Sequence, residues 1–170
     1  KYITDYFNFD KVLPMNTGAE AVETALKLCR KWAYKKKEIA ENEAVILFAT
    51  ENFHGRTLAI VSASTDPDSK GGFGPYLPGI QVIQYNDADA LEQALEANPN
   101  IAGFIVEPIQ GEAGVMVPDE GYLKKASELC KRHNVLFIAD EVQTGIARTG
   151  RLLATCGNCN CENKDCSGTP

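Results

Sequence analysis

Short apolar runs alternate with segments of helical periodicity through most of the chain. The runs are rich in β-branched and aromatic residues, as buried strands are, whereas the segments between them repeat apolar residues at helical spacing. This alternation favours a parallel sheet with right-handed crossovers and helices on both faces. We therefore predict an α/β fold, a doubly wound and mainly parallel sheet. The predicted strands are 44–50, 80–85, 101–106 and an apolar run that starts at Val135; the predicted helices are 17–36, a short one ending near Ser64, 87–97 and 121–133.

The composition is that of a soluble globular domain. Among the 170 residues, 44% are apolar and 24% are charged, which is ordinary for such a protein and enough for a real core. The net charge of −6 argues against a general nucleic-acid binder. No apolar run approaches the roughly 20 residues that a membrane helix needs. The chain opens with Lys1 and lacks an apolar signal segment, so we expect it to be an interior part of a longer protein.

An acid ends the apolar run that starts at Val135. Asp140 follows the run directly, and Gln143 comes shortly after it. Ligands of open α/β sheets bind beyond the carboxyl ends of strands, so both residues occupy a promising place. An acid leaving an apolar strand is costly to bury unless it meets a cation, such as a protonated ring nitrogen. Alternatively, Asp140 caps the next loop or pairs with Arg148 or Arg151; this stretch alone supports both interpretations equally.

Polar clusters also follow two other predicted strands. The first strand leads into Phe53, His54 and Arg56, and the third leads into Glu107 and Glu112. Phe53 can stack on a flat ring, and Arg56 can bind a carboxylate through two hydrogen bonds. The alternatives are a core Phe53, a surface ion pair for Arg56 and a packed or hydrogen-bonded His54. Recurrence of polar clusters at the same end of three strands predicts one shared site.

The helix predicted at 17–36 begins with a recognisable cap. Thr17 and Glu20 have the spacing of a capping box. Gly18 and Ala19 are small enough for an anion to approach the bare amides at a helix N-terminus. The alternative is simply a helix that starts well.

Four cysteines crowd the last part of the chain. Cys156, Cys159, Cys161 and Cys166 are suitable in number for a tetrahedral zinc site, but their spacing is not that of a standard knuckle pair. We favour the alternative, in which the segment 154–170 is a divergent, disordered polar tail with accidental cysteines.

With these motifs in order, the chain resembles the large domain of class III (ω-type) pyridoxal-phosphate aminotransferases, which have fold type I. The resemblance covers about residues 1–153, as a partial cofactor-binding domain. The sequence around Met15 and Phe73 favours the ornithine type over the acetylornithine or γ-aminobutyrate types. The motifs that carry the resemblance are Met15-Asn16-Thr17-Gly18-Ala19-Glu20-Ala21, Asn52-Phe53-His54-Gly55-Arg56-Thr57, Phe73-Gly74-Pro75, Glu107-Pro108-Ile109-Gln110-Gly111-Glu112 and Asp140-Glu141-Val142-Gln143-Thr144-Gly145.

The resemblance implies roles at the cofactor. Asp140 would bond the protonated pyridine nitrogen and keep the ring an electron sink. Gln143 would contact the phenolic oxygen of the ring, and Phe53 would stack on its face. Gly18 and Ala19 would donate their backbone amides to the phosphate.

The resemblance also implies a reaction. The δ-amino group of ornithine would pass to 2-oxoglutarate by ping-pong exchange, giving glutamate semialdehyde and glutamate. Arg56 would bind a substrate carboxylate, and Glu112 would act as a gate that pairs with an arginine beyond this chain. Such enzymes are expected as homodimers, in the mitochondrial matrix or the cytoplasm.

The sequence departs from the family after Leu153. The family's Schiff-base lysine follows the Asp-x-x-Gln strand by one further loop and strand, whereas here Ala154 opens the cysteine-rich tail. The faint likeness of the sequence around Lys164 to the lysine motif is taken as coincidence. We therefore expect this chain alone not to transaminate. The alternatives are a non-catalytic dimerisation partner or a protein organised by a metal-binding tail.

Overall fold

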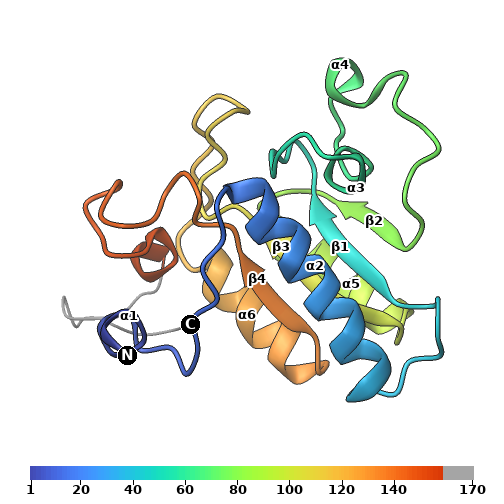
Figure 1. Cartoon of the computed structure of the whole chain (residues 1–170), viewed down its shortest axis with the longest axis horizontal. Helices are drawn as coiled ribbons and strands as arrows, with labels where there is room; N and C mark the ends of the chain where they lie inside the picture. The colour runs from blue at the N-terminus through green and yellow to red at the C-terminus, as the bar shows by residue number, and fades with distance from the viewer. Residues whose placement is uncertain (159–170) are drawn as a thin grey trace.

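A four-stranded parallel sheet with helices on both faces forms the centre of the computed structural model, which describes residues 1–158 (Figure 1). The strand order is β2-β1-β3-β4, and all neighbouring strands pair in parallel. The predicted doubly wound α/β fold is therefore confirmed. The strands are β1 (Val45–Ala49), β2 (Ile80–Ile83), β3 (Ile101–Val106) and β4 (Leu136–Ala139).

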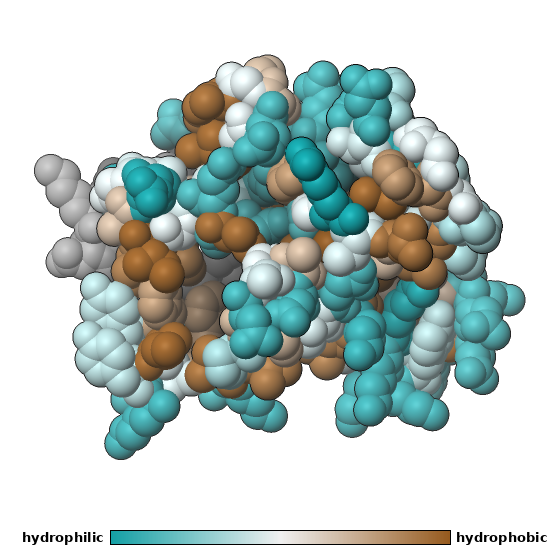
Figure 2. All heavy atoms as spheres, turned by 45° about the horizontal axis from the view of Figure 1, so that its top comes forward, coloured by the Kyte–Doolittle hydropathy of each residue, from teal (hydrophilic) through white to brown (hydrophobic). Residues whose placement is uncertain are grey.

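The strand order reverses between β1 and β3. From β1 the chain passes outward to β2 and then crosses back to β3 on the other side of β1. Their carboxyl ends lie at the edge of the sheet that Figure 1 shows uppermost, where the helix at residue 18 also begins. Figure 2 turns this edge toward the viewer and shows polar side chains beside apolar ones. A crevice at such a reversal is the usual ligand site of an open α/β sheet.

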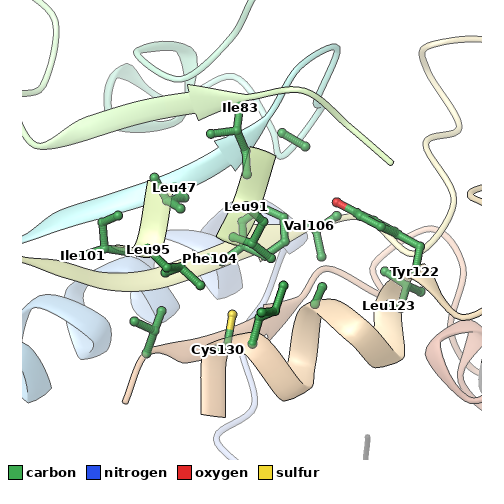
Figure 3. Packing of buried hydrophobic residues seen from close by; sticks show 14 of the residues in the cluster. Leu47, Ile83, Leu91, Leu95, Ile101, Phe104, Val106, Tyr122, Leu123 and Cys130 are labelled. Atoms are coloured by element: carbon green, nitrogen blue, oxygen red, sulfur yellow. The ribbon is translucent and has the colours of Figure 1, made fainter. Parts of the chain in front are cut away.

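Helices α5 (Ala88–Ala97) and α6 (Tyr122–Arg132) cover one face of the sheet. Strand residues point alternately to the two faces, and on this face Leu47 and Phe104 are fully buried. They pack against apolar side chains of both helices (Figure 3). The helical contacts include Leu91, Leu95, Leu123, Ala126 and Leu129.

Helix α2 (Gly18–Lys35) covers the opposite face. Its buried stripe of Val22, Leu26, Cys29 and Ala33 packs on strand residues that include Ile46, Phe48 and Ile105. The helix lies very close to β3 at Gly103. A Cβ added to this glycine would lie only 2.6 Å from the Cys29 sulfur, so a larger residue would not fit without a shift. The long first helix is thus fixed against the central strands, and its N-terminus is carried to the carboxyl edge.

Four shorter elements complete the described part: α1 (Tyr2–Phe7), α3 (Leu58–Val61), α4 (Pro67–Lys70) and the 3-10 helix η1 (Ala154–Asn158). Helix α4 lies inside a segment that is dense in turn-forming residues, and its existence was not predicted. The side chain of Asp66 accepts hydrogen bonds from the amides of Asp68 and Ser69, while Pro67 occupies the first turn. This cap allows one helical turn in a segment that otherwise favours loops.

The packed part of the chain extends beyond residue 153, where the sequence analysis placed its end. Ala154 and Thr155 are buried in η1, directly after the boundary that the sequence analysis set at residue 153. Glu141 holds the start of η1 in this position, because its carboxylate accepts hydrogen bonds from the amides of Ala154 (3.0 Å) and Thr155 (2.8 Å). Of the tail cysteines, Cys156 is half-buried in η1, and Cys159, Cys161 and Cys166 lie outside the described residues.

Within residues 1–158 no group of three or more His, Cys, Asp or Glu side chains is arranged to hold a metal ion. None of the helices in this part of the chain is long and apolar enough to cross a membrane.

Candidate active site

A cavity of about 350 Å³ opens at the carboxyl edge of the sheet, where the strand order reverses. Its walls come from the N-terminus of α2 and from the loops that follow β1, β3 and β4. The structure therefore brings together segments that are far apart in the sequence, as the recurring polar clusters predict. The lining residues to which the sequence analysis gave a role are Gly18, Ala19, Phe53, Glu112, Asp140 and Gln143.

The N-terminus of α2 forms one wall. The capping box is present: Thr17 Oγ1 accepts a hydrogen bond from the Glu20 amide (3.1 Å), and the Glu20 carboxylate accepts one from the Thr17 amide (3.1 Å). Within residues 1–158 the amides of Gly18 and Ala19 have no hydrogen-bond partner. Residue 18 must be small, because an added Cβ would lie 2.6 Å from Val142 Cγ1. Two unpaired amides at a helix N-terminus make this wall suitable for an anion.

The loop after β1 contributes Phe53 and is held at several points. Asn52 is buried, and its side-chain amide donates hydrogen bonds to the carbonyls of Ala49 (2.6 Å) and Ala63 (3.0 Å). The Phe53 amide donates to the Glu107 carboxylate at 2.8 Å. These bonds fix a half-buried aromatic ring at the cavity wall, where it can support a flat ligand.

Arg56 stands apart from the other predicted residues. Its guanidinium carbon lies 5.7 Å from the centroid of the Phe53 ring, a cation–π arrangement. It lines a separate cavity of about 390 Å³ together with Asp66 and Phe73. The structure thus places Arg56 beside the ring-bearing loop and outside the cavity that holds Asp140.

Asp140 is an enclosed acid of the cavity. Its side chain is only 5% exposed, and Oδ2 lies 2.6 Å from Nδ1 of His54, whose side chain is fully buried. The other oxygen, Oδ1, accepts a hydrogen bond from the Val142 amide (3.1 Å). Of the alternatives for Asp140, the capping of the following loop is therefore present, and its side-chain partner is His54 instead of Arg148 or Arg151.

Glu107 is a second buried acid of the cavity, directly after β3. Burial raises the pKa of its carboxyl to about 7, against the opposing effect of the hydrogen bond from the Phe53 amide. The neighbouring charges of Asp140 and Glu112 raise the pKa further. Glu107 is thus an acid that takes up or releases a proton near neutral pH.

A short hairpin brings Glu112 toward Gln143. Gln110 and Met116 exchange backbone hydrogen bonds of 3.0 and 2.9 Å, and the chain between them carries Glu112. The side-chain amide of Gln143 lies 3.4 Å from Glu112 Oε1. A larger residue at position 111 would have to displace the Gln143 side chain, because an added Cβ would lie 1.7 Å from Gln143 Oε1.

Two titratable residues of the cavity, His54 and Glu107, were given no role in the predicted site, although both were noticed at strand ends. His54 was interpreted as a packed or hydrogen-bonded histidine, and the structure shows both states together with its bond to Asp140. Glu107 follows a fully buried strand directly, as Asp140 follows its own strand. An acid in that position is the sequence signal that could have identified Glu107.

The raised pKa of Glu107 predicts a specific pH dependence of stability. The folded state holds this proton more tightly than the unfolded state, so stability is highest below the ordinary pKa of 4.5 and falls as the pH rises to about 7. The loss through this group is expected to be about 2–4 kcal/mol. Glu107→Gln keeps an acceptor for the Phe53 amide but cannot ionise, so it should escape this loss.

The measurement is chemical denaturation of the cofactor-free, full-length protein at pH 5 and pH 8. The variant should gain stability relative to the parent at pH 8 and differ little at pH 5. Glu120→Gln, at an exposed position, is the matched control and should behave as the parent does. An equal effect of Glu107→Gln at both pH values would contradict the predicted titration.

The family model and the similar proteins of known sequence point to the same family. The sequence model of the class III aminotransferases matches residues 1–159. The mitochondrial ornithine aminotransferase of Rattus norvegicus is 64% identical over 154 residues, which cover 91% of this chain and 35% of that protein. The corresponding enzyme of Drosophila ananassae is 63% identical, with the same shares covered.

Solved structures of aminotransferases are also similar to this chain. Ornithine aminotransferase from Toxoplasma gondii ME49 superimposes with a TM-score of 0.88 at 55% identity, over 90% of this chain and 36% of that one. Acetylornithine aminotransferase from Elizabethkingia anophelis gives a TM-score of 0.75 at 64% identity, over 90% of this chain and 37% of that one.

The chain spans about a third of the length of the relatives it matches. The family match covers nearly all of the described residues, and the fold and the cavity agree with it. This chain therefore belongs to the class III aminotransferases, a family of pyridoxal-phosphate-dependent enzymes.

Proposed function

We propose that this chain forms the cofactor-binding part of an aminotransferase that moves the δ-amino group of ornithine to 2-oxoglutarate, giving glutamate semialdehyde and glutamate. The observation that carries the proposal is the enclosed Asp140 carboxylate, which lies in a cavity that also contains unpaired helix amides and a flat aromatic ring. These groups suit the ring nitrogen, the phosphate and the ring face of pyridoxal phosphate.

The cavity residues fit the cofactor in chemistry and arrangement. The amides of Gly18 and Ala19 would hold the phosphate, because they lie at a helix N-terminus that lines the cavity and have no hydrogen-bond partner within residues 1–158. Phe53 would support the ring, and Gln143 would meet its phenolic oxygen. Asp140 would hold a proton at the ring nitrogen. When bound, the cofactor supplies an electron sink for the electrons of the substrate's breaking C–H bond.

Substrate recognition is assigned to Arg56 and Glu112. Arg56 offers a planar donor pair that suits a carboxylate, and it lies in the cavity next to the ring-bearing loop. A third cavity lies between the Asp140 cavity and the Arg56 cavity. It shares Phe53 and Glu112 with the first and Asp66 with the second. A substrate could therefore extend from the cofactor toward Arg56, with Glu112 along its path.

The direct test is an amino-donor assay on the full-length protein with 2-oxoglutarate as acceptor. Ornithine should be the preferred donor, with formation of glutamate semialdehyde. A preference for acetylornithine or γ-aminobutyrate would support the alternative types, of which the 64% identity to the Elizabethkingia anophelis enzyme favours the acetylornithine type. Absence of turnover with all three donors would contradict the proposal. Within residues 1–158 no lysine lines the Asp140 cavity, so the assay needs the full-length protein.

Assembly and compartment belong to the same proposal. We infer a homodimer by the resemblance to the family, and size measurement of the full-length protein in solution tests it. The mitochondrial matrix and the cytoplasm are the two candidate compartments, because the names of the Drosophila ananassae and Rattus norvegicus relatives include the mitochondrion and that of the Schizosaccharomyces pombe relative does not. Fractionation of cells that express the full-length protein decides between the two.

Gly111 offers a test of the role of Gln143. Gly111→Ala is expected to displace the Gln143 side chain, because the new Cβ would lie 1.7 Å from Gln143 Oε1. Loss of one hydrogen bond to the cofactor should weaken its binding about 2- to 10-fold. The measurement is equilibrium binding of pyridoxal phosphate to the full-length protein.

A double-mutant cycle provides the control for this prediction. In a Gln143→Ala background, adding Gly111→Ala should weaken cofactor binding no further, since the displaced group is already absent. If the two losses add instead, Gly111 acts through the hairpin backbone and not through Gln143.

A further inference from the structure

We propose that Glu141 is a positioning residue, whose carboxylate ties the turn 141–145 to residues 154–155 and so keeps Asp140 and Gln143 directed at the cofactor. The inference rests on the proposed cofactor site and adds to it a residue that does not line the cavity. Three features of the structure carry it: the donors around the carboxylate, the closed turn, and the contacts that lead from the turn into the cavity.

The Glu141 carboxylate accepts hydrogen bonds from two separate parts of the chain. Oε1 accepts from the Thr155 amide at 2.8 Å and from the hydroxyl of the same residue. Oε2 accepts from the Ala154 amide at 3.0 Å and from the Thr144 hydroxyl at 2.6 Å. Both threonines are buried, so these charge-assisted bonds are shielded from water. The carboxylate is thus held in one orientation and joins the loop after β4 to the start of η1.

The main chain of the same residue closes the turn 141–145. The Glu141 carbonyl accepts a hydrogen bond from the Gly145 amide at 2.8 Å, one residue after the side-chain bond to Thr144. The turn is closely packed, because a Cβ added at Gly145 would lie 2.9 Å from the Glu141 carbonyl oxygen and 3.2 Å from its Cβ. One residue therefore fixes the turn through both its side chain and its main chain.

Val142 connects the turn to two walls of the cavity. Its amide donates to Oδ1 of Asp140 at 3.1 Å, so the place of the turn sets the orientation of that carboxylate. Its side chain lies against the N-terminus of α2, where a Cβ added at Gly18 would come within 2.6 Å of Val142 Cγ1. Asp140, Val142 and Gln143 line the cofactor cavity. Glu141 lines a separate cavity of about 440 Å³ instead, and acts on the cofactor cavity only through these neighbours.

Glutamine is an informative replacement for Glu141, because it keeps the size of the side chain and cannot keep its hydrogen bonds. Its amide group has a single oxygen, so in either orientation its NH2 group meets a backbone N–H, that of Ala154 or that of Thr155. The threonine hydroxyls can rotate to accept a hydrogen bond, whereas a backbone amide can only donate. Glu141→Gln therefore loosens the turn without creating a cavity.

The test measures pyridoxal-phosphate binding to the full-length protein and the visible circular dichroism of the bound cofactor, which reports how its ring is held. Glu141→Gln should weaken binding about 3- to 30-fold and should reduce the circular dichroism even at saturating cofactor. Leu95→Ala, a core truncation in α5 away from the turn, should lower stability and leave the circular dichroism unchanged. Glu120→Gln, at an exposed position, should match the parent in every quantity.

A second variant keeps the test decisive if Glu141→Gln does not fold. Thr144→Val combined with Thr155→Val removes the two hydroxyl donors and keeps the charge and both amide bonds. It should shift binding and circular dichroism in the same direction by a smaller factor, about 2- to 5-fold in binding.

Two results would overturn the inference. The first is a folded Glu141→Gln protein, or the double threonine variant in its place, that is less stable than the parent but binds the cofactor with unchanged affinity and circular dichroism. The second is an equal loss of circular dichroism in Leu95→Ala, which would show that any loss of stability disturbs the ring. These measurements use the cofactor alone, so a failure with ornithine would contradict the proposed substrate and not the role of Glu141.

Discussion

Replacement of Asp140 by Asn is expected to slow amino transfer by about 10²–10³-fold while pyridoxal phosphate remains bound. Asparagine keeps the size of the side chain, and its single carbonyl oxygen can still accept one of the two hydrogen bonds that Asp140 accepts from His54 and the Val142 amide. It removes the negative charge, so the ring nitrogen would tend to lose its proton. Because the demand of the ring for electrons is greatest in the transition state, the rate should suffer more than the affinity.

Asp140→Glu is the companion variant, since it keeps the charge and moves it by one methylene. It should be less damaging than Asp140→Asn. The measurement is single-turnover spectroscopy of the conversion of the cofactor from its aldehyde to its amine form in the full-length protein. A rate for Asp140→Asn near that of the parent would show that Asp140 is not the partner of the ring nitrogen.

Phe104→Ala is expected to lower the free energy of unfolding by about 3–5 kcal/mol. Phe104 is fully buried in the central strand β3, between β1 and β4, and its ring lies 6.4 Å from that of Phe137. Truncation removes apolar contacts and leaves a cavity that packed neighbours can fill only in part. Strand β3 leads directly to Glu107, so the site should be weakened together with the core.

Phe73→Ala is the matched control for this prediction. Phe73 is 53% exposed, so its truncation should change stability by no more than about 0.5 kcal/mol. The measurement is chemical denaturation of the cofactor-free, full-length protein. A loss below about 1 kcal/mol for Phe104→Ala would contradict the assignment of this face of the sheet as the core.

The regular elements were predictable because their signals are local. Strand β3 was predicted with both of its ends correct, because the polar residues Asn100 and Glu107 mark the two ends of its apolar run. Helix α2 was predicted from its capping box and its apolar stripe. The ends of the other strands shifted by one or two residues, because hydrogen-bond pairing with neighbours decides where a strand stops.

The features that sequence reasoning missed depend on contacts between distant segments. The pairing of His54 with Asp140 spans 86 residues, and no local pattern indicates which of several acids meets a given histidine. The strand order, which creates the cavity between β1 and β3, is likewise a property of the assembled sheet. The helix at 154–158 forms because Glu141 clamps its amides, whereas its composition alone favours a polar tail.

The predicted site was brought together in large part for one physical reason: parallel strands end at the same edge. Gly18, Phe53, Asp140 and Gln143 therefore line one cavity. Arg56 lies outside it, because the chain turns away after Gly55, whose φ of +125° is a conformation that glycine adopts readily.

A crystal structure of the full-length protein with pyridoxal phosphate tests the central claim most directly. We predict the phosphate at the amides of Gly18 and Ala19, the ring against Phe53, and the ring nitrogen within hydrogen-bond distance of the Asp140 carboxylate. A cofactor bound elsewhere, or one whose ring nitrogen faces away from Asp140, would contradict the assignment of this cavity as the active site.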